Sequence, residues 1–162
     1  MTRLWRPAYV AIGSNLHSPR ERVLEAMDRM RALSGAPPLR SHLYLSRPMG
    51  PKDQPDYVNA AVALLTHATP RELLNELLAI ERAMGRARQE RWGPRVIDLD
   101  LLWMVDGAAV EPGLTVPHPG VSIRNFVLYP LADIAPTMKI PEYGTVLDLK
   151  RSVGGDGISV LQ

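Results

Sequence analysis

The chain has 162 residues, with 19 Lys and Arg against 17 Asp and Glu, a formal net charge of +2. This length predicts a single domain over residues 1–162, and so weak a positive charge favours small anionic ligands over nucleic acid. With no cysteine, disulfides and thiolate zinc sites are excluded. The sequence has neither an apolar N-terminal segment nor a long apolar run, which predicts a cytoplasmic protein with no membrane partner.

The first predicted unit is a short apolar strand at residues 8–12 followed by a helix that begins at Pro19. Ser18 is predicted to cap this helix, with Glu21 completing a capping box. Apolar residues then recur at helical spacing, and Gly35 is predicted to end the helix in the left-handed conformation.

A second unit repeats these signals. An apolar strand at residues 59–66 leads to Thr69, which is predicted to cap a helix with Glu72 in a capping box, and Gly85 is predicted to end that helix. Further short strands are predicted at residues 42–46, 96–105 and 138–140. This order predicts an α+β fold of the ferredoxin-like split βαβ type, with helices packed on one face of an antiparallel sheet.

Two long segments, residues 47–57 and 85–95, are rich in proline or arginine and are longer than simple connections need. Loops of this kind usually carry function, although three prolines in the first could equally make a rigid surface crossover. By contrast, residues 150–162 are rich in glycine, which predicts weak order there.

The predicted strand at residues 96–105 carries two aspartates, Asp98 and Asp100, in an otherwise apolar run. Strand alternation places both carboxylates on one face, roughly 7 Å apart. Carboxylates without a sulfur ligand suit Mg²⁺, which often bridges them to substrate phosphates, and the arginines of the preceding loop can grip those phosphates. The alternative is a half-exposed strand with solvated aspartates beside a basic surface loop.

Three ordered motifs, GPKDQPDYVNAAV, GRARQERWGPRVIDLDLL and LTVPHPGVSIRNFVLYPL, resemble those of the 6-hydroxymethyl-7,8-dihydropterin pyrophosphokinases of folate biosynthesis. The match extends from AYVAIGSNL to about Pro136. The resemblance implies a monomeric, ferredoxin-like enzyme whose small-molecule substrates are ATP and the pterin. Such an enzyme transfers the β,γ-pyrophosphoryl group of ATP to the pterin hydroxymethyl oxygen and releases AMP.

The resemblance implies that Asp98 and Asp100 hold two Mg²⁺ ions against the ATP phosphates, with Arg86 and Arg95 as catalytic arginines. It leaves the general base open. The ATP contacts that it implies are Glu81, Arg88, Trp92, Leu101, Thr115, His118 and Arg124, with Arg88 and Trp92 in a loop that closes over the nucleotide.

For the pterin, the resemblance implies that Asn59 bonds the amide edge of the ring and that Tyr57 and Phe126 stack on its faces. The other implied pocket residues are Gly13, Ser46, Pro48 and Met49. Taken alone, Phe126 favours a buried core ring, and Asn59 favours a turn cap.

Three positions depart from the family pattern, which often has a polar residue, an arginine and a tyrosine where this chain has Leu78, Gly113 and Pro119. We therefore expect altered contacts on the adenine side with the same reaction type.

Two other functions use similar residues. A metal-dependent nuclease or nucleotidyl transferase needs paired aspartates but also a nucleic-acid groove, and the arginines here cluster in one loop. A ferredoxin-like RNA-binding module presents aromatic residues on exposed strands, and this chain is only 6% aromatic.

Overall fold

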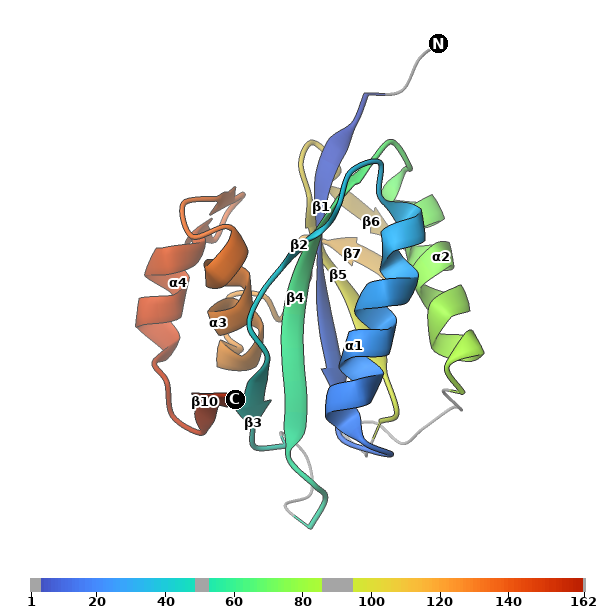
Figure 1. The fold of residues 1–162 in the computed structure, drawn as a ribbon. Helices are drawn as coiled ribbons and strands as arrows, with labels where there is room; N and C mark the ends of the chain where they lie inside the picture. The colour runs from blue at the N-terminus through green and yellow to red at the C-terminus, as the bar shows by residue number, and fades with distance from the viewer. Residues whose placement is uncertain (1–3, 49–52, 86–94, 162) are drawn as a thin grey trace.

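The structure, a computed structural model, describes residues 4–48, 53–85 and 95–161. Its centre is a six-stranded sheet made of β1 (Arg6–Ser14), β2 (Leu39–Arg40), β3 (Tyr44–Ser46), β4 (Tyr57–Thr66), β5 (Asp98–Met104) and β10 (Ile158–Val160). The strand order is β10-β3-β4-β1-β5, and β2 also pairs with β4 (Figure 1). All these pairings are antiparallel, as predicted.

Helices cover both faces of this sheet (Figure 1). The helices are α1 (Pro19–Met30), α2 (Pro70–Ala83), α3 (Asn125–Ile134) and α4 (Val146–Val153), and a 3-10 turn (Arg31–Leu33) follows α1. α1 and α2 share one face, as predicted, whereas α3 packs on the opposite face with α4 against it. The predicted α+β class is confirmed, and the layout with one covered face is corrected to two. Two small hairpins complete the fold, β6 (Ala109–Glu111) with β7 (Leu114–Val116) and β8 (Lys139–Ile140) with β9 (Gly144–Thr145).

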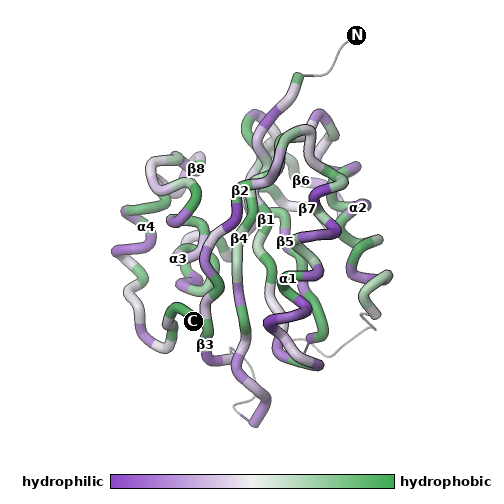
Figure 2. The backbone as a smooth tube through the Cα atoms, viewed as in Figure 1, coloured by the Kyte–Doolittle hydropathy of each residue, from purple (hydrophilic) through white to green (hydrophobic). Residues whose placement is uncertain are grey.

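The larger apolar core lies between the sheet and the first two helices. Strand alternation supplies it, because every second side chain of β1, β4 and β5 points to this face. Figure 2 shows apolar residues along the central strands and hydrophilic ones on the outer helices. The strand residues of this core include Val10, Ile12, Val58, Ala60, Val62, Leu99 and Leu101.

A smaller core fills the other face. There Ala11 of β1 and Leu102 of β5 pack with the apolar side of α3, which contributes Val127, Leu128 and Leu131. The register between β1 and β5 shifts between Tyr9 and Val10. None of the helices among the described residues has the length and apolar character needed to span a membrane.

The second helix begins and ends as the sequence predicts. The Thr69 side chain accepts a hydrogen bond from the backbone N–H of Glu72, while the Glu72 carboxylate accepts from the N–H of Thr69 at 2.9 Å. Gly85 follows this helix with a φ of +87°, the left-handed region that glycine enters most easily.

The first helix begins at Pro19 as predicted, but the predictions that Ser18 caps its start and that Gly35 ends it are wrong. Ser18 has a φ of 64° and makes no side-chain cap bond, because a capping side chain needs an extended backbone to reach the first turn. The chain continues from Met30 into the 3-10 turn. Gly35 instead leaves room for the ring of Trp5, because a Cβ there would lie 2.5 Å from that ring.

The C-terminal segment is more regular than its glycines predicted. α4 extends to Val153, and β10 then pairs with β3, with Ile158 opposite Ser46. Asn125 donates side-chain hydrogen bonds to the carbonyl oxygens of Gly154 and Asp156, at 3.2 and 2.8 Å. These backbone partners order a segment whose composition alone favours disorder.

Candidate active site

A cleft of about 260 Å³ opens on the face of the sheet that carries α3. Its floor is formed by the ends of β1, β4 and β5, and one wall comes from α3. It gathers residues from distant parts of the chain. The predicted site residues that line it are Gly13, Ser46, Tyr57, Asn59, Arg95, Asp98, Asp100, Arg124 and Phe126.

The cleft floor contains a row of residues across three strands. Gly13 of β1 pairs with Asn59 of β4 on one side and with Asp98 of β5 on the other. A Cβ at Gly13 would lie 3.2 Å from the Asn59 Oδ1 and 3.6 Å from a ring carbon of Tyr57. Glycine therefore allows the amide and the ring to approach the centre of the floor closely.

Asp98 and Asp100 lie on the cleft face of β5, as strand alternation predicts. Leu99 and Leu101 point into the core on the other face, where each is 4% exposed. Opposite Asp100 on β1 is Ala11, a small residue that leaves room above the strand. One strand thus presents two carboxylates to the cleft while its other face stabilises the fold.

The donor set suits a hard cation that shares its coordination with a ligand. Within residues 4–48, 53–85 and 95–161, no group of three or more His, Asp or Glu side chains could form an all-protein metal site. Two carboxylates in one cleft are what Mg²⁺ commonly uses when waters and substrate phosphates supply its other ligands. Arg95 and Arg124 line the same cleft and can contact such phosphates.

The polar side chain of Asn59 is held in a defined orientation. Its Nδ2 donates a 2.6 Å hydrogen bond to the hydroxyl of Ser46, and Asn59 is 4% exposed. Because Asn59 lies inside β4, opposite Tyr44 of β3, the turn-cap interpretation does not apply. The side chain is part of a prepared polar surface beside Tyr57.

The aromatic and cationic walls come from the start of α3. Phe126 is partly buried: it packs against the smaller core and also lines the cleft, so the interpretation as a buried core ring describes only one side of it. The guanidinium carbon of Arg124, the residue before α3, lies 5.9 Å from the centre of the Phe126 ring. Arg124 also crowds Gly120, where a Cβ would lie 2.6 Å from its Nε.

Several predicted residues fall elsewhere. Pro48 is half-buried just beyond β3 and does not line the main cleft as the described residues form it. The predicted residues that lie outside the described part of the chain are Met49, Arg86, Arg88 and Trp92.

A second groove, of about 310 Å³, runs beside β5. It contains three of the predicted ATP-binding residues, Leu101, Thr115 and His118. Its remaining walls are largely apolar, and they include the departures Gly113 and Pro119. Asp100 borders both this groove and the main cleft, so a ligand with an apolar end and a charged end can occupy both spaces.

His118 is held against the edge of β5. Its backbone N–H donates to the carbonyl of Leu102 at 2.8 Å, and its Nδ1 accepts from the N–H of Gly120 at 3.0 Å. Burial lowers the pKa of His118, Arg124 lowers it further, and Asp98 opposes part of this shift. The arrangement favours a neutral imidazole that carries its proton on Nε2.

Glu81 occupies a different position from the other predicted ATP residues. It is 3% exposed on α2, and its carboxylate accepts a 2.7 Å hydrogen bond from the backbone N–H of Leu99. It lines none of the grooves found among the described residues. Its contact with Leu99 attaches α2 to the strand segment between the two aspartates.

Asn15 is a structural residue of the site that the sequence analysis missed. It is 1% exposed, and its Nδ2 donates to the Gln54 Oε1 and to the carbonyl of Pro55, both at 2.9 Å. Its Oδ1 accepts from the backbone N–H of Arg95 at 2.8 Å, and its own N–H donates to the Arg95 carbonyl. Asn15 therefore joins the ends of both long loops, and a polar residue directly after a buried strand is the only local signal for this.

Residues 9–136 match the sequence profile of the 7,8-dihydro-6-hydroxymethylpterin-pyrophosphokinase family. The chain is similar to the 2-amino-4-hydroxy-6-hydroxymethyldihydropteridine pyrophosphokinase of Pseudomonas aeruginosa, with 45% identity over 94% of this chain and 95% of that protein. The enzyme of the same name from Haemophilus influenzae is 41% identical over 88% of this chain and 89% of that protein.

The fold is also similar to solved structures. A crystal structure of wild-type Plasmodium falciparum HPPK-DHPS gives a TM-score of 0.73 at 14% identity, over 93% of this chain. This chain spans 43% of the length of that protein. At so low an identity the likeness concerns the fold alone.

Proposed function

The chain belongs to the 7,8-dihydro-6-hydroxymethylpterin-pyrophosphokinase family, and from this membership we propose its reaction and the roles of its residues. The chain transfers the β,γ-pyrophosphoryl group of ATP to the hydroxymethyl oxygen of 6-hydroxymethyl-7,8-dihydropterin, a step of folate biosynthesis. The observation that supports this proposal is the row Asn59, Gly13, Asp98, in which a side-chain amide and a carboxylate lie on one cleft floor, on either side of a glycine.

The pterin ring lies between Tyr57 and Phe126, with its amide edge toward Asn59. A flat heteroaromatic ring gains from aromatic contacts on its faces, and a side-chain amide can both donate to and accept from its edge. The bond from Asn59 to Ser46 holds the amide plane before the ligand arrives, which lowers the cost of ordering it on binding.

Asp98 and Asp100 hold two Mg²⁺ ions, which when bound neutralise phosphate charge and orient the transferred group. Arg95 and Arg124 supply further positive charge from the cleft walls. Arg86, Arg88 and Trp92 lie outside the described residues, and their roles in a closing loop stay predictions.

The hydroxymethyl oxygen attacks the β-phosphorus of ATP, and the bond from that phosphorus to the oxygen bridging the α- and β-phosphates breaks. The products are the pterin diphosphate and AMP, and the hydroxyl loses its proton. Phosphoryl transfer needs little covalent help from the protein, so these residues act by positioning the two substrates and stabilising charge.

The nucleoside of ATP occupies the groove beside β5, where Leu101, Thr115 and His118 contact it. Because Asp100 borders both spaces, the phosphates cross from this groove into the cleft at the metal site. Glu81 acts behind the strand by holding the Leu99 N–H.

The test is AMP formation from ATP and Mg²⁺, with and without the pterin, with both products followed by chromatography. Wild type is compared with Asp98→Ala and with Asp28→Ala, which changes a surface aspartate on α1. We expect AMP and pterin diphosphate only when the pterin is present, and only from wild type and Asp28→Ala. A folded wild-type protein that forms no pterin-dependent AMP would refute the proposed reaction.

A further inference from the structure

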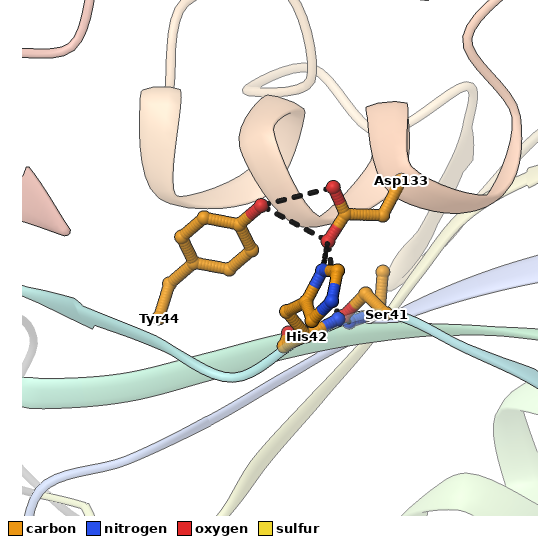
Figure 3. A network of polar contacts seen from close by, with 5 residues as sticks. Ser41, His42, Tyr44 and Asp133 are labelled. Carbon is orange, nitrogen blue, oxygen red and sulfur yellow. Dashed lines mark hydrogen bonds and ion pairs between the residues drawn. The ribbon is translucent and has the colours of Figure 1, made fainter. Parts of the chain in front are cut away.

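Three residues along α3 share one side of the helix and link the cleft to the sheet. Phe126, Tyr129 and Asp133 are three and seven positions apart, which places them on one stripe. Phe126 lines the cleft. Tyr129 meets the ring of Tyr44 edge-on at 6.3 Å, and Asp133 accepts a hydrogen bond from the Tyr44 hydroxyl, with both carboxylate oxygens at 2.9 Å (Figure 3).

The Asp133 carboxylate also holds the segment that enters β3 (Figure 3). The backbone N–H of His42 donates to its Oδ2 at 3.0 Å, and the His42 ring Nδ1 lies 3.1 Å from the same oxygen. Ser41 extends the network to β4, because its hydroxyl donates to the His42 carbonyl and accepts from the N–H of Ala61. One side chain of α3 is thus bonded to two residues, His42 and Tyr44, at the start of β3.

The hydroxyl of Tyr44 is suited to this contact. Tyr44 is 5% exposed, and burial together with the bond to Asp133 raises its pKa far above the ordinary value, so the phenol stays protonated. A buried hydroxyl that lost its acceptor would carry a desolvation penalty. The contact is therefore maintained in the folded protein.

The first turn of α3 depends on such outside contacts. Pro130 lies inside this helix and has no N–H, so the helix cannot supply the usual i+4 donor to the carbonyl of Phe126. The turn that carries Phe126 nevertheless stays joined to the rest of α3, since the N–H of Leu128 donates to the carbonyl of Arg124 at 3.0 Å, so its position follows the contacts that hold the whole helix. The bonds of Asn125 to the C-terminal segment hold one end of α3, and Asp133 holds the other.

The place where α3 is held adjoins the cleft floor. Tyr44 pairs with Asn59 across β3 and β4, and Ser46, which bonds Asn59, is two residues further along β3. Strand β3 thus holds Asp133 through Tyr44 and positions the proposed pterin-binding amide through Ser46.

We propose that Tyr44 and Asp133 form a positioning clamp, which fixes α3 on β3 and so sets the placement of the Phe126 ring over Asn59. Neither residue of the clamp lines the cleft, so both are positioning residues. The consequence for substrate rests on the proposed function, because the ligand held between Phe126 and Asn59 is taken to be the pterin.

The placement of Phe126 can be followed without any substrate. Phe126 is the only phenylalanine of the chain, so labelling with 4-fluorophenylalanine gives a single ¹⁹F signal. We expect this signal to shift or broaden in Asp133→Ala and to stay at the wild-type position in the matched control Asp28→Ala. Asp133→Glu, which restores a carboxylate acceptor, should move the signal back toward wild type.

The kinetic test separates positioning from general damage. In Asp133→Ala and in Tyr44→Phe, which keeps the ring against Tyr129, we expect KM for the pterin to rise about tenfold, equivalent to about 1.4 kcal/mol. KM for ATP should rise less than KM for the pterin, since no residue of α3 lines the groove beside β5 and only Arg124, at the start of the helix, faces the phosphates. The double variant Tyr44→Phe/Asp133→Ala should be no worse than the worse single variant, because both remove one contact.

An unchanged ¹⁹F signal in folded Asp133→Ala would overturn the clamp. So would equal losses toward the pterin and ATP in Tyr44→Phe, which would indicate general destabilisation. If Asp133→Ala does not fold, Tyr44→Phe gives the kinetic result alone. A signal that moves while wild type forms no pterin-dependent AMP would support the clamp and refute the proposed function.

Discussion

The two faces of strands β1, β4 and β5 serve different purposes: one face stabilises the fold, and the other lines the cleft. On the face under α1 and α2, residues such as Val10 and Leu99 form the apolar core. On the opposite face, the neighbouring positions Gly13, Asp98 and Asp100 line the cleft. Successive residues of one strand thus serve opposite purposes, because strand geometry sends their side chains to opposite sides.

This division makes the site separable from the fold. A carboxylate on a strand is unfavourable when its neighbours repel it, and two on one face repel each other. The core on the other face offsets that cost, so changes on the cleft face should alter activity more than stability. Changes at the adjacent core positions should do the reverse.

The largest effect is expected from Asp100→Asn, which keeps the side-chain shape and removes the charge. We expect pterin-dependent AMP formation to fall by roughly 10²–10³-fold, the size seen when one electrostatic group of an active site is lost. The midpoint of thermal unfolding should change little, because the side-chain shape is kept and the core on the other face of the strand is intact. Retained activity together with a lowered midpoint would contradict the division between the faces.

The matched change on the other face is Leu99→Ala, one residue away. Leu99 is 4% exposed, so we expect the free energy of unfolding to fall by about 2–5 kcal/mol, measured by urea denaturation. The molecules that stay folded should keep kcat near the wild-type value, and any kinetic change should fall on KM for ATP, because Leu99 also lines the groove beside β5. If Leu99→Ala instead lost activity without losing stability, the core face would have to be assigned a direct catalytic role.

The sequence predicted those features of the fold and the site that depend on local patterns. Alternation around Asp98 and Asp100 and the cap at Thr69 depend on near neighbours, and the structure confirms both. α3 was missed because it has Pro130 inside it and no capping side chain at Arg124, and it is apolar on most of its surface. Its burial against the sheet overrides these poor local signals.

Local sequence patterns could not predict the contacts that arrange the site. Asn15 bonds to residues 39, 40 and 80 positions away, and no periodicity encodes such pairs. The cap predicted at Ser18 failed for a different reason. Its sequence matches that of the Thr69 cap, but its backbone is left-handed. Long-range contacts decide the role of Asn15, and the left-handed backbone at residues 17 and 18 decides the outcome at Ser18.

A smaller effect, confined to the cleft face, is expected from Gly13→Ala. The new Cβ would lie 3.2 Å from the Asn59 Oδ1, so the amide must move by a few tenths of an ångström. We expect KM for the pterin to rise several-fold while KM for ATP is unchanged. The free energy of unfolding should not fall, because alanine restricts the unfolded chain more than glycine does. A pterin KM equal to that of wild type would show that the floor tolerates a side chain there.

The smallest expected effect is the contribution of His118, at the edge of β5, to the pH dependence of stability. Burial and Arg124 lower the pKa of His118 below its ordinary 6.5, so the unfolded chain binds this proton more readily than the folded protein does. The stability that His118 contributes is therefore complete above pH 6.5 and is lost as the pH falls from there through the folded pKa.

We expect metal-free wild type to lose more unfolding free energy between about pH 7.5 and pH 5.5 than His118→Gln does, as measured by urea denaturation in EDTA. Glutamine does not titrate, yet its amide oxygen can still accept from the N–H of Gly120, which protonation of the imidazole Nδ1 would prevent. Equal losses in the two proteins would show that His118 is as easily protonated in the groove as in water. In that case the nucleotide would meet a protonated imidazole at mildly acidic pH.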